Sequence, residues 1–263
     1  MNSWVTEELC DWVARQATEA ATRAAAMLAS GPKAEFKADG TIVTEIDRAT
    51  ERFLRAAIGE RFPEHAVLGE EYGYDARSAD VPLWAIDPVD GTVNLANGLP
   101  FWCVSVGLIV DDVPRLGVIV APTMGQTFLG GEGLGVTLNG RPLAPVGAGR
   151  PLTWEDTYGI CSASAREVDF QRLPCRLRVQ GSAALELAYT AAGLLKGCQS
   201  IGTSLYDVAA GMAMCRELGA AIEWHSGPAW TPSRMLSGEY RRDILLTAPP
   251  ETLAFVRERL RPR

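Results

Sequence analysis

Hydrophobic residues recur every three or four positions near the start of the chain. From Leu9 to Leu28 this spacing predicts an amphipathic helix over residues 5–29. A similar pattern from Phe53 onwards predicts a second helix, for which Asp47 is a natural N-cap. The first part of the chain is therefore expected to supply two helices with one apolar face each.

The middle of the chain changes to short β-rich runs. Residues 81–86, VPLWAI, read as an apolar strand. From residue 103, apolar runs are separated by turn signals such as Asn139-Gly140, which predicts an antiparallel meander. The glycines of this region miss the spacing of a dinucleotide-binding loop, so we interpret them as turn residues.

The stretch PVGAGRP at 145–151 is the best candidate for an internal boundary. We divide the chain into an α+β half, 1–145, and an α/β half, 146–263, which form one compact unit with the site between them. In the second half we expect strands near 157–162, 176–180, 220–224 and 243–248, and helices at 182–195, at 207–219 and from about 250.

Composition narrows the class of protein. Of 263 residues, 47% are hydrophobic and 22% charged, as in ordinary globular proteins, and the net charge of −7 argues against a nucleic-acid or membrane-surface partner. The six cysteines form no CxxC pair, which favours reduced thiols. The first 30 residues carry acids, and no apolar run approaches the roughly 18 residues of a membrane span. We therefore expect a cytoplasmic protein without a signal peptide.

Two acids follow the apolar start of the stretch WAIDPVDGTVN (84–94), and together they suggest a chemical role. Asp87 or Asp90 alone would more often cap a turn or helix, but together they repel each other unless a cation lies between them. Hard cations such as Mg²⁺ prefer carboxylate and carbonyl oxygens, and the Val89 carbonyl lies between the two acids. Gly91 and Thr92 then predict a short helix whose free amides bind phosphate oxygens. The stretch thus indicates metal, phosphate and water chemistry.

Other acids are weaker signals, and competing chemistries lack their residues. Glu70 and Glu71 would usually be solvated, and Asp207, at the start of a predicted helix, would usually be an N-cap. The chain has no Cys-x₅-Arg and no Gly-x-Ser-x-Gly motif. His65 and His225 read as surface or packing residues. Of the hydrolytic mechanisms considered, metal-assisted hydrolysis is the one for which the sequence contains the required residues.

Three segments together resemble the inositol monophosphatase family. They are GEE at 69–71, WAIDPVDGTVN at 84–94 and YDVAAG at 206–211. The resemblance extends along most of the chain and implies a Mg²⁺-dependent, lithium-sensitive phosphomonoesterase. It also implies a layered α-β-α-β-α sandwich, with a large antiparallel N-terminal sheet and a smaller C-terminal α/β half. The family is usually dimeric, and Trp224 and Trp230 could form an aromatic interface of a homodimer.

By this resemblance, two or three Mg²⁺ ions would share one site. Thr92, paired with Asp47, would help Glu70 to deprotonate the attacking water, and Lys37 would lie nearby. The metal ligands would be Glu70, Asp87, the Val89 carbonyl, Asp90 and Asp207.

The substrate loop departs from the inositol-using members. Ser200 stands where they often carry a Glu that contacts a sugar hydroxyl, and Tyr206 replaces the usual Trp. Adenosine 3′,5′-bisphosphate, NADP, fructose 1,6-bisphosphate and histidinol phosphate therefore stay open beside inositol, sugar and polyol phosphates. A partner-binding regulatory protein with incidental activity is an alternative of another class. The expected substrate and phosphate contacts are Asp90, Gly91, Thr92, Gly181, Ser182, Ser200 and Asp207.

Overall fold

A large, mostly antiparallel sheet forms the first half of the fold in this computed structural model, which describes residues 4–29, 34–36, 42–75, 81–227, 229–238 and 242–262. Within these residues the only parallel pair of the sheet is β3 with β5. The predicted meander from residue 103 is confirmed. The spatial order is β10 (Arg141–Pro142), β9 (Gly135–Leu138), β8 (Gln126–Gly131), β7 (Val113–Ala121), β6 (Cys103–Val110), β5 (Leu83–Asp90), β3 (Ala66–Gly69) and β4 (Gly73–Asp75).

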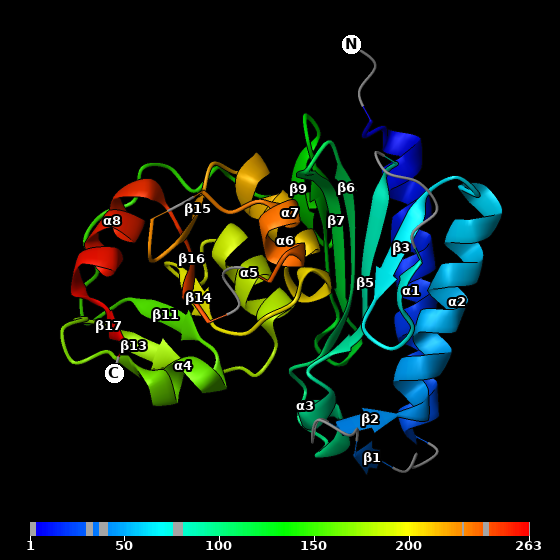
Figure 1. Cartoon of the computed structure of the whole chain (residues 1–263), viewed down its shortest axis with the longest axis horizontal. Helices are drawn as coiled ribbons and strands as arrows, with labels where there is room; N and C mark the ends of the chain where they lie inside the picture. Colours follow the sequence, from blue (N-terminus) through cyan, green and yellow to red (C-terminus); the bar gives the residue numbers. More distant parts are fainter. Residues whose placement is uncertain are drawn as a thin grey trace.

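Two helices cover one face of this sheet (Figure 1). They are α1 (Glu7–Ala29) and α2 (Glu45–Arg61), joined through the short hairpin of β1 (Ala34–Phe36) and β2 (Ile42–Thr44). The apolar faces predicted for both helices are confirmed, because Leu9, Trp12 and Leu54 are buried against the sheet.

The other face of the sheet carries α6 (Leu205–Glu217), which packs in turn on α5 (Ala183–Ala191). Two glycines, Gly107 on β6 and Gly117 on β7, permit this contact. A Cβ atom at Gly117 would lie 2.2 Å from the carbonyl oxygen of Ala210, so the helix backbone rests directly on the strand. The close approach places the first turn of α6 beside the end of β5.

The smaller sheet lies beyond α5 and α6, so the layers alternate helix, sheet, helix, sheet, helix (Figure 1). The outer layer includes α8 (Pro250–Arg259), which packs on β16. The expected α-β-α-β-α sandwich is therefore confirmed. The strand order is β13 (Arg176–Arg178), β11 (Thr157–Ile160), β14 (Cys198–Ser200), β16 (Leu245–Ala248) and β15 (Ala221–Trp224).

Several short elements were not predicted. Helices of five or six residues complete fewer than two turns, so they leave no hydrophobic period in the sequence. The small antiparallel pair β12–β17 closes the C-terminal end. These elements are α4 (Ser162–Glu167), α7 (Pro232–Leu236), the 3₁₀ turn η1 (Pro122–Met124), β12 (Val168–Asp169) and β17 (Arg261–Pro262).

The expected aromatic interface is wrong for two residues. Trp224 and Trp230 are 3% and 5% exposed because they pack into the hydrophobic core of their own chain. Side chains buried in this way cannot form a surface for a second copy.

The segment 143–156 joins the two sheets and contains no helix or strand. It includes the expected boundary, but α6 belongs to the second half of the sequence and packs on β6 and β7 of the first. The two halves therefore share one core. No helix among the described residues is long and apolar enough to cross a membrane.

The contact between α6 and β7 generates a first prediction. Gly117→Ala should destabilise the protein by about 1–3 kcal/mol, because the added methyl group overlaps backbone atoms of Ala210 that cannot move freely. In a chain of this size each kcal/mol corresponds to roughly 2–4 °C in Tm, which thermal unfolding measures.

The matched control is Gly59→Ala in α2, where a Cβ atom has nothing within 4 Å. This control should keep or raise the Tm, because alanine favours a helix interior over glycine. An unchanged Tm in the Gly117→Ala protein would contradict the close packing of α6.

Candidate active site

The acids Asp87 and Asp90 lie inside β5, at its C-terminal end. The strand was predicted over 81–86, but pairing with β6 continues to Asp90 after an irregularity between the two acids. Asp87 and Asp90 are both buried. β5 pairs antiparallel with β6 and parallel with β3, so the acids lie at the end of a strand in a mixed sheet. The site forms where the end of β5 meets the second half of the chain.

A left-handed glycine turns the chain after the strand. Gly91 has φ +96°, and a Cβ atom there would lie 2.6 Å from the carbonyl oxygen of Phe101. Only glycine accommodates both the backbone conformation and the space. The short helix α3 (Thr92–Ala96) begins at the next residue, as predicted.

Asp90 is held by the N-terminus of α5. Ser182, the N-cap of this helix, donates its hydroxyl proton to Asp90 Oδ2 at 2.7 Å. The amides of Ala184 and Ala183 donate to Asp90 at 2.6 and 3.3 Å. A carboxylate is favoured at this end of a helix dipole. The contact joins residues 92 to 94 positions apart and ties the two halves of the fold together.

Asn94 is a positioning residue that the sequence did not reveal. Its Nδ2 donates to the carbonyl oxygens of Phe101 at 2.6 Å and of Gln180 at 2.8 Å. These bonds fix the loop carrying Gly181 and Ser182 against α3. The asparagine was visible within WAIDPVDGTVN, but a partner 86 residues away leaves no local signal.

The predicted N-cap roles of Asp47 and Asp207 are wrong, each by three residues. Thr44 is the N-cap of α2 and Ser204 that of α6, and each acid lies at the N3 position of a capping box. Asp47 Oδ2 accepts from the Thr44 amide at 2.8 Å, and Asp207 Oδ2 from the Ser204 amide at 2.6 Å. The capping box uses one oxygen of each acid and aims the side chain back across the helix start.

The second oxygen of Asp47 meets Thr92. Thr92 Oγ1 lies 3.0 Å from Asp47 Oδ1 and 2.9 Å from the carbonyl oxygen of Val89. A hydroxyl has one proton, so Thr92 donates to one of these acceptors at a time and keeps lone pairs for another donor. Thr92 lines the cavity described below, whereas Asp47 is fully buried behind it.

Glu70 lies in a turn that a buried glutamate fixes. Glu51 of α2 is fully buried, and its carboxylate accepts from the amides of Glu71 at 2.6 Å and Tyr72 at 3.2 Å. Arg55 pairs with the same carboxylate at 2.6 Å. A Cβ atom at Gly69 would lie 2.0 Å from Glu51, so this glycine makes room for the carboxylate. Glu51 was not predicted as a site residue, because in the sequence it resembles any other polar residue of a helix.

These elements surround a cavity of about 340 Å³. Neither histidine lines it, and His65 Nδ1 accepts from Trp84 Nε1 at 3.0 Å. Of the expected site residues, it contains Glu70, Asp87, Val89, Asp90, Gly91, Thr92, Gly181, Ser182 and Asp207. Residues not foreseen in its wall are Cys161, Ser162, Ala163, Ala183, Glu186, Ile201 and Thr203.

Two expected residues in the described part of the chain, Asp47 and Ser200, do not line the cavity. Ser200 lines a much smaller cavity behind the wall, and its hydroxyl is 3.2 Å from Thr203 Oγ1. Lys37 lies outside the described residues. Among polar side chains of this loop, Thr203 is the one that reaches the main cavity.

The buried acids raise one another's pKa. Burial is the main cause for Asp87, whose pKa lies well above the usual range, with further increases from the charges of Asp90, Glu70 and Asp207. Burial also raises the pKa of Asp207 well above its usual value, helped by Asp90. The pKa of Asp90 rises to about 6, because burial outweighs the hydrogen bonds from Ser182 and the α5 amides. The cavity therefore concentrates negative charge that its protein partners do not neutralise.

A divalent cation fits the chemistry of this donor set, since hard oxygen ligands and uncompensated negative charge are what Mg²⁺ requires. The side chains are not drawn together around a common point. In the part of the chain described here, no group of three or more His, Cys, Asp or Glu side chains converges as a ready metal site. The hydrogen bonds to Ser182, Ala184 and Ser204 account for this, because they hold Asp90 and Asp207 at helix starts.

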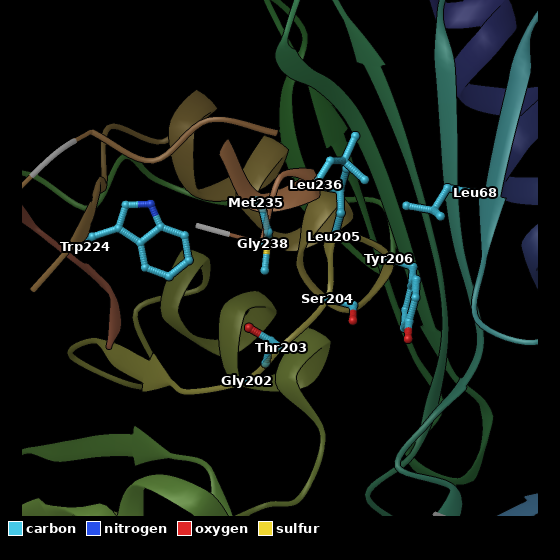
Figure 2. A pocket seen from close by; sticks show the side chains of 10 residues that line it. All are labelled: Leu68, Gly202, Thr203, Ser204, Leu205, Tyr206, Trp224, Met235, Leu236 and Gly238. Atoms are coloured by element: carbon cyan, nitrogen blue, oxygen red, sulfur yellow. The ribbon is translucent and has the colours of Figure 1, made fainter. Parts of the chain in front are cut away.

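A second cavity of about 240 Å³ adjoins the first and shares Thr203 with it. Figure 2 shows Leu68 and Tyr206 on one side, next in sequence to the segments of Glu70 and Asp207, and Trp224 on the opposite side. Its lining carries no carboxylate, so the acid-lined cavity is the better candidate for catalysis.

Comparisons with known proteins show the family of the chain. The model of the "Inositol monophosphatase family" matches residues 9–244. The chain is 35% identical over 191 residues to an inositol-1-monophosphatase of Synechocystis, covering 70% of this chain and 67% of the relative. It is 32% identical over 198 residues to the Nus factor SuhB of Pseudomonas aeruginosa, covering 70% and 73%.

A solved structure shows the same fold over nearly the whole chain. The inositol monophosphatase of Anabaena superposes with a TM-score of 0.76 at 28% identity, covering 96% of this chain and 94% of the other. The family match, the sequence relatives and the shared fold all point to one family. The chain belongs to the inositol monophosphatase family and is a phosphomonoesterase.

Proposed function

We propose that this protein hydrolyses a small phosphate monoester of the inositol, sugar or polyol class, with Mg²⁺ as cofactor, and releases inorganic phosphate. The observation that carries the proposal is that Asp87, Asp90 and Asp207 line one cavity, beside the turn of Gly91 and Thr92. The pKa of each is raised, that of Asp90 by burial and those of Asp87 and Asp207 by burial and by the charges of neighbouring acids, and a cation site accounts for such a cluster.

The residues that would hold Mg²⁺ are Glu70, Asp87, the Val89 carbonyl, Asp90 and Asp207, and two or three ions are proposed. When bound, these ions supply Lewis-acid chemistry, polarising the phosphoryl oxygens and lowering the pKa of a water.

The side chains around this centre take proton and positioning roles. Thr92 Oγ1, while it donates to Asp47 Oδ1, can accept a hydrogen bond from the attacking water and orient it. Glu70 is the proposed acceptor of the proton of that water, and the bonds of Glu51 hold the turn that carries it. Lys37 is proposed near the same centre by resemblance alone.

Different residues of the cavity wall are proposed to contact the phosphate and the alcohol of the substrate. First-turn amides at Gly91 and Thr92 are proposed to bind phosphate oxygens, as free amides at helix starts do. Gly181, Ser182 and Asp207 also line the cavity and are proposed to lie along the alcohol. Ser200 is proposed to act only indirectly, through its contact with Thr203.

Several phosphate esters are proposed as candidate substrates. A relative from Aquifex aeolicus is named a fructose-1,6-bisphosphatase/inositol-1-monophosphatase. Fructose 1,6-bisphosphate, histidinol phosphate, adenosine 3′,5′-bisphosphate and NADP therefore belong in the test panel beside inositol 1-phosphate. The replacement of the family's acid at Ser200 supports keeping this panel broad.

A cytoplasmic homodimer is the proposed form of the protein. All six cysteines are free thiols, which supports a reducing compartment. Val93, Leu99 and Phe101 are exposed apolar residues around α3, and they offer a surface for a second copy in place of the buried tryptophans.

The proposed hydrolysis is tested by phosphate release. Wild-type protein with Mg²⁺ should hydrolyse at least one ester of the panel, EDTA should abolish the activity, and lithium should reduce it. Asp90→Asn should lower kcat by on the order of 100-fold or more, since even residues supporting a metal ligand cost about 10–100-fold.

Asp11→Asn is the matched control, because Asp11 is an exposed residue of α1 far along the chain from the site. It should keep wild-type turnover. Full turnover by the Asp90→Asn protein, with its fold verified by circular dichroism, would refute the mechanism.

The pKa directions generate a second prediction, on stability. A carboxyl whose pKa is raised in the folded state binds protons more tightly when folded, so stability falls as pH rises from the normal value near 4 through the raised one. For Asp90 this window ends at about 6. In EDTA, the Tm should therefore fall between pH 4 and pH 7.

Mg²⁺ should raise the Tm more at pH 8 than at pH 5, because a cation binds the ionised acids and stabilises the folded state by mass action. Differential scanning calorimetry with NaCl of equal ionic strength as control measures this difference. An equal Mg²⁺ shift at both pH values would show that these acids do not form the site.

A second candidate function is a regulatory protein whose phosphatase activity is incidental. The similarity to the Nus factor SuhB of Pseudomonas aeruginosa favours keeping it. Feeble turnover across the whole panel, together with a stable stoichiometric complex in a pull-down, would support it. Efficient turnover of one ester would count against it.

A further inference from the structure

Glu186 is a buried acid in the wall of the cavity. It lies in the first turn of α5, is 2% exposed, and lines both the main cavity and the small cavity behind it. The cavity's other acids are Glu70, Asp87, Asp90 and Asp207, which are the proposed metal ligands. The second half of the chain contributes three titratable side chains to the cavity wall, namely Cys161, Glu186 and Asp207. Asp207 is a proposed metal ligand, so Glu186 is the one carboxylate among them without an assigned role.

The carboxyl of Glu186 has few partners in the protein. Its Oε1 accepts a long hydrogen bond of 3.4 Å from the Gln180 amide, and among the described residues it forms no ion pair. Burial raises the pKa of Glu186 to about 8, and the charge of Asp90 adds to this. A buried acid with one weak bond, facing a cavity, is characteristic of a functional group.

A purely local role for Glu186 does not account for the burial. Ser182 caps α5 through its bond to the Leu185 amide at 3.3 Å, and the N3 position of a capping box is occupied by Leu185. Glu186 is one residue further on, so its carboxyl does not complete the cap. A first-turn acid that served only the helix dipole would be equally effective in solvent.

The neighbouring Gln199 does not use the carboxyl either. Gln199 is 1% exposed and lines the same small cavity, and neither atom of its amide has a hydrogen-bond partner in the described part of the chain. Glu186 and Gln199 therefore both line the small cavity with unused hydrogen-bonding capacity, and they form no hydrogen bond with each other. Buried polar groups are rarely left in this state.

We propose that Glu186 recognises the alcohol half of the substrate by binding a hydroxyl or ammonium group close to the ester oxygen. This inference rests on the proposed function and deepens it. The substrate class is a phosphate monoester of a polyol or amino alcohol, in which a second hydrogen-bond donor reaches the Glu186 carboxyl. Ser200 does not line the main cavity, whereas the carboxyl-bearing Glu186 does.

The experiment compares three esters with the intact protein and Mg²⁺. Inositol 1-phosphate offers hydroxyls, histidinol phosphate offers an ammonium, and 4-nitrophenyl phosphate offers no donor. The readout is the ratio of kcat/KM for each donor-bearing ester to kcat/KM for 4-nitrophenyl phosphate. In Glu186→Leu the ratio for the preferred ester should fall about tenfold or more, chiefly through KM, because a polar substrate group loses its partner.

Glu186→Gln keeps the shape and an acceptor for Gln180, and it distinguishes the two donors. If the substrate donates from a hydroxyl, the ratio of the Glu186→Gln protein should lie between those of the wild-type and Glu186→Leu proteins. If it donates from an ammonium, the ratio of the Glu186→Gln protein should fall as far as that of the Glu186→Leu protein. The matched control is Glu167→Gln, at the exposed end of α4, which should leave the ratio at the wild-type value. Thermal unfolding verifies each fold, and Glu186→Gln carries the test should the Leu variant not fold.

An equal loss on all three esters would overturn the inference and make Glu186 a structural residue. An unchanged ratio in both Glu186 variants would overturn it as well. Failure of the proposed function looks different, since wild-type protein would then release no phosphate even from 4-nitrophenyl phosphate.

Discussion

Repulsion among buried carboxylates is the constraint on which the site depends. Asp87, Asp90 and Asp207 are brought from a strand and a helix into one cavity, where burial raises the pKa of each. Such a cluster opposes folding at neutral pH unless something offsets its charge. The surrounding architecture is best understood as a frame that holds the acids in place until a cation binds.

The frame uses backbone amides in preference to cationic side chains. Asp90 accepts from the start of α5, and Asp207 from the start of its own helix, α6. These bonds orient each acid without cancelling its charge, so the attraction for Mg²⁺ remains. Because Asp90 lies in the larger sheet and α5 beyond it, the same contact joins the two halves. Catalytic geometry and the association of the halves are therefore linked through one side chain.

Sequence patterns predicted the parts of this frame that are local. The acids of WAIDPVDGTVN lie three residues apart at the end of one strand, and Thr92 begins the next helix, so their spacing alone placed Asp87, Asp90 and Thr92 together. The layered fold also followed, through the family resemblance. The caps were wrong by three residues because an acid at N3 resembles one at the N-cap. Glu51 and Asn94 were missed because their partners lie 20 and 86 residues away. Ser200 was expected in the main cavity, yet the turn of its loop presents Thr203 there.

Anomalous X-ray diffraction from crystals soaked in Mn²⁺ would locate the bound cations. Anomalous peaks should lie in the cavity, with Glu70, Asp87, Asp90 and Asp207 as ligands. Binding should swing the Asp207 carboxylate away from the Ser204 amide. Crystals of active protein with Mn²⁺ bound elsewhere, and with these carboxylates in their present hydrogen bonds, would contradict the account.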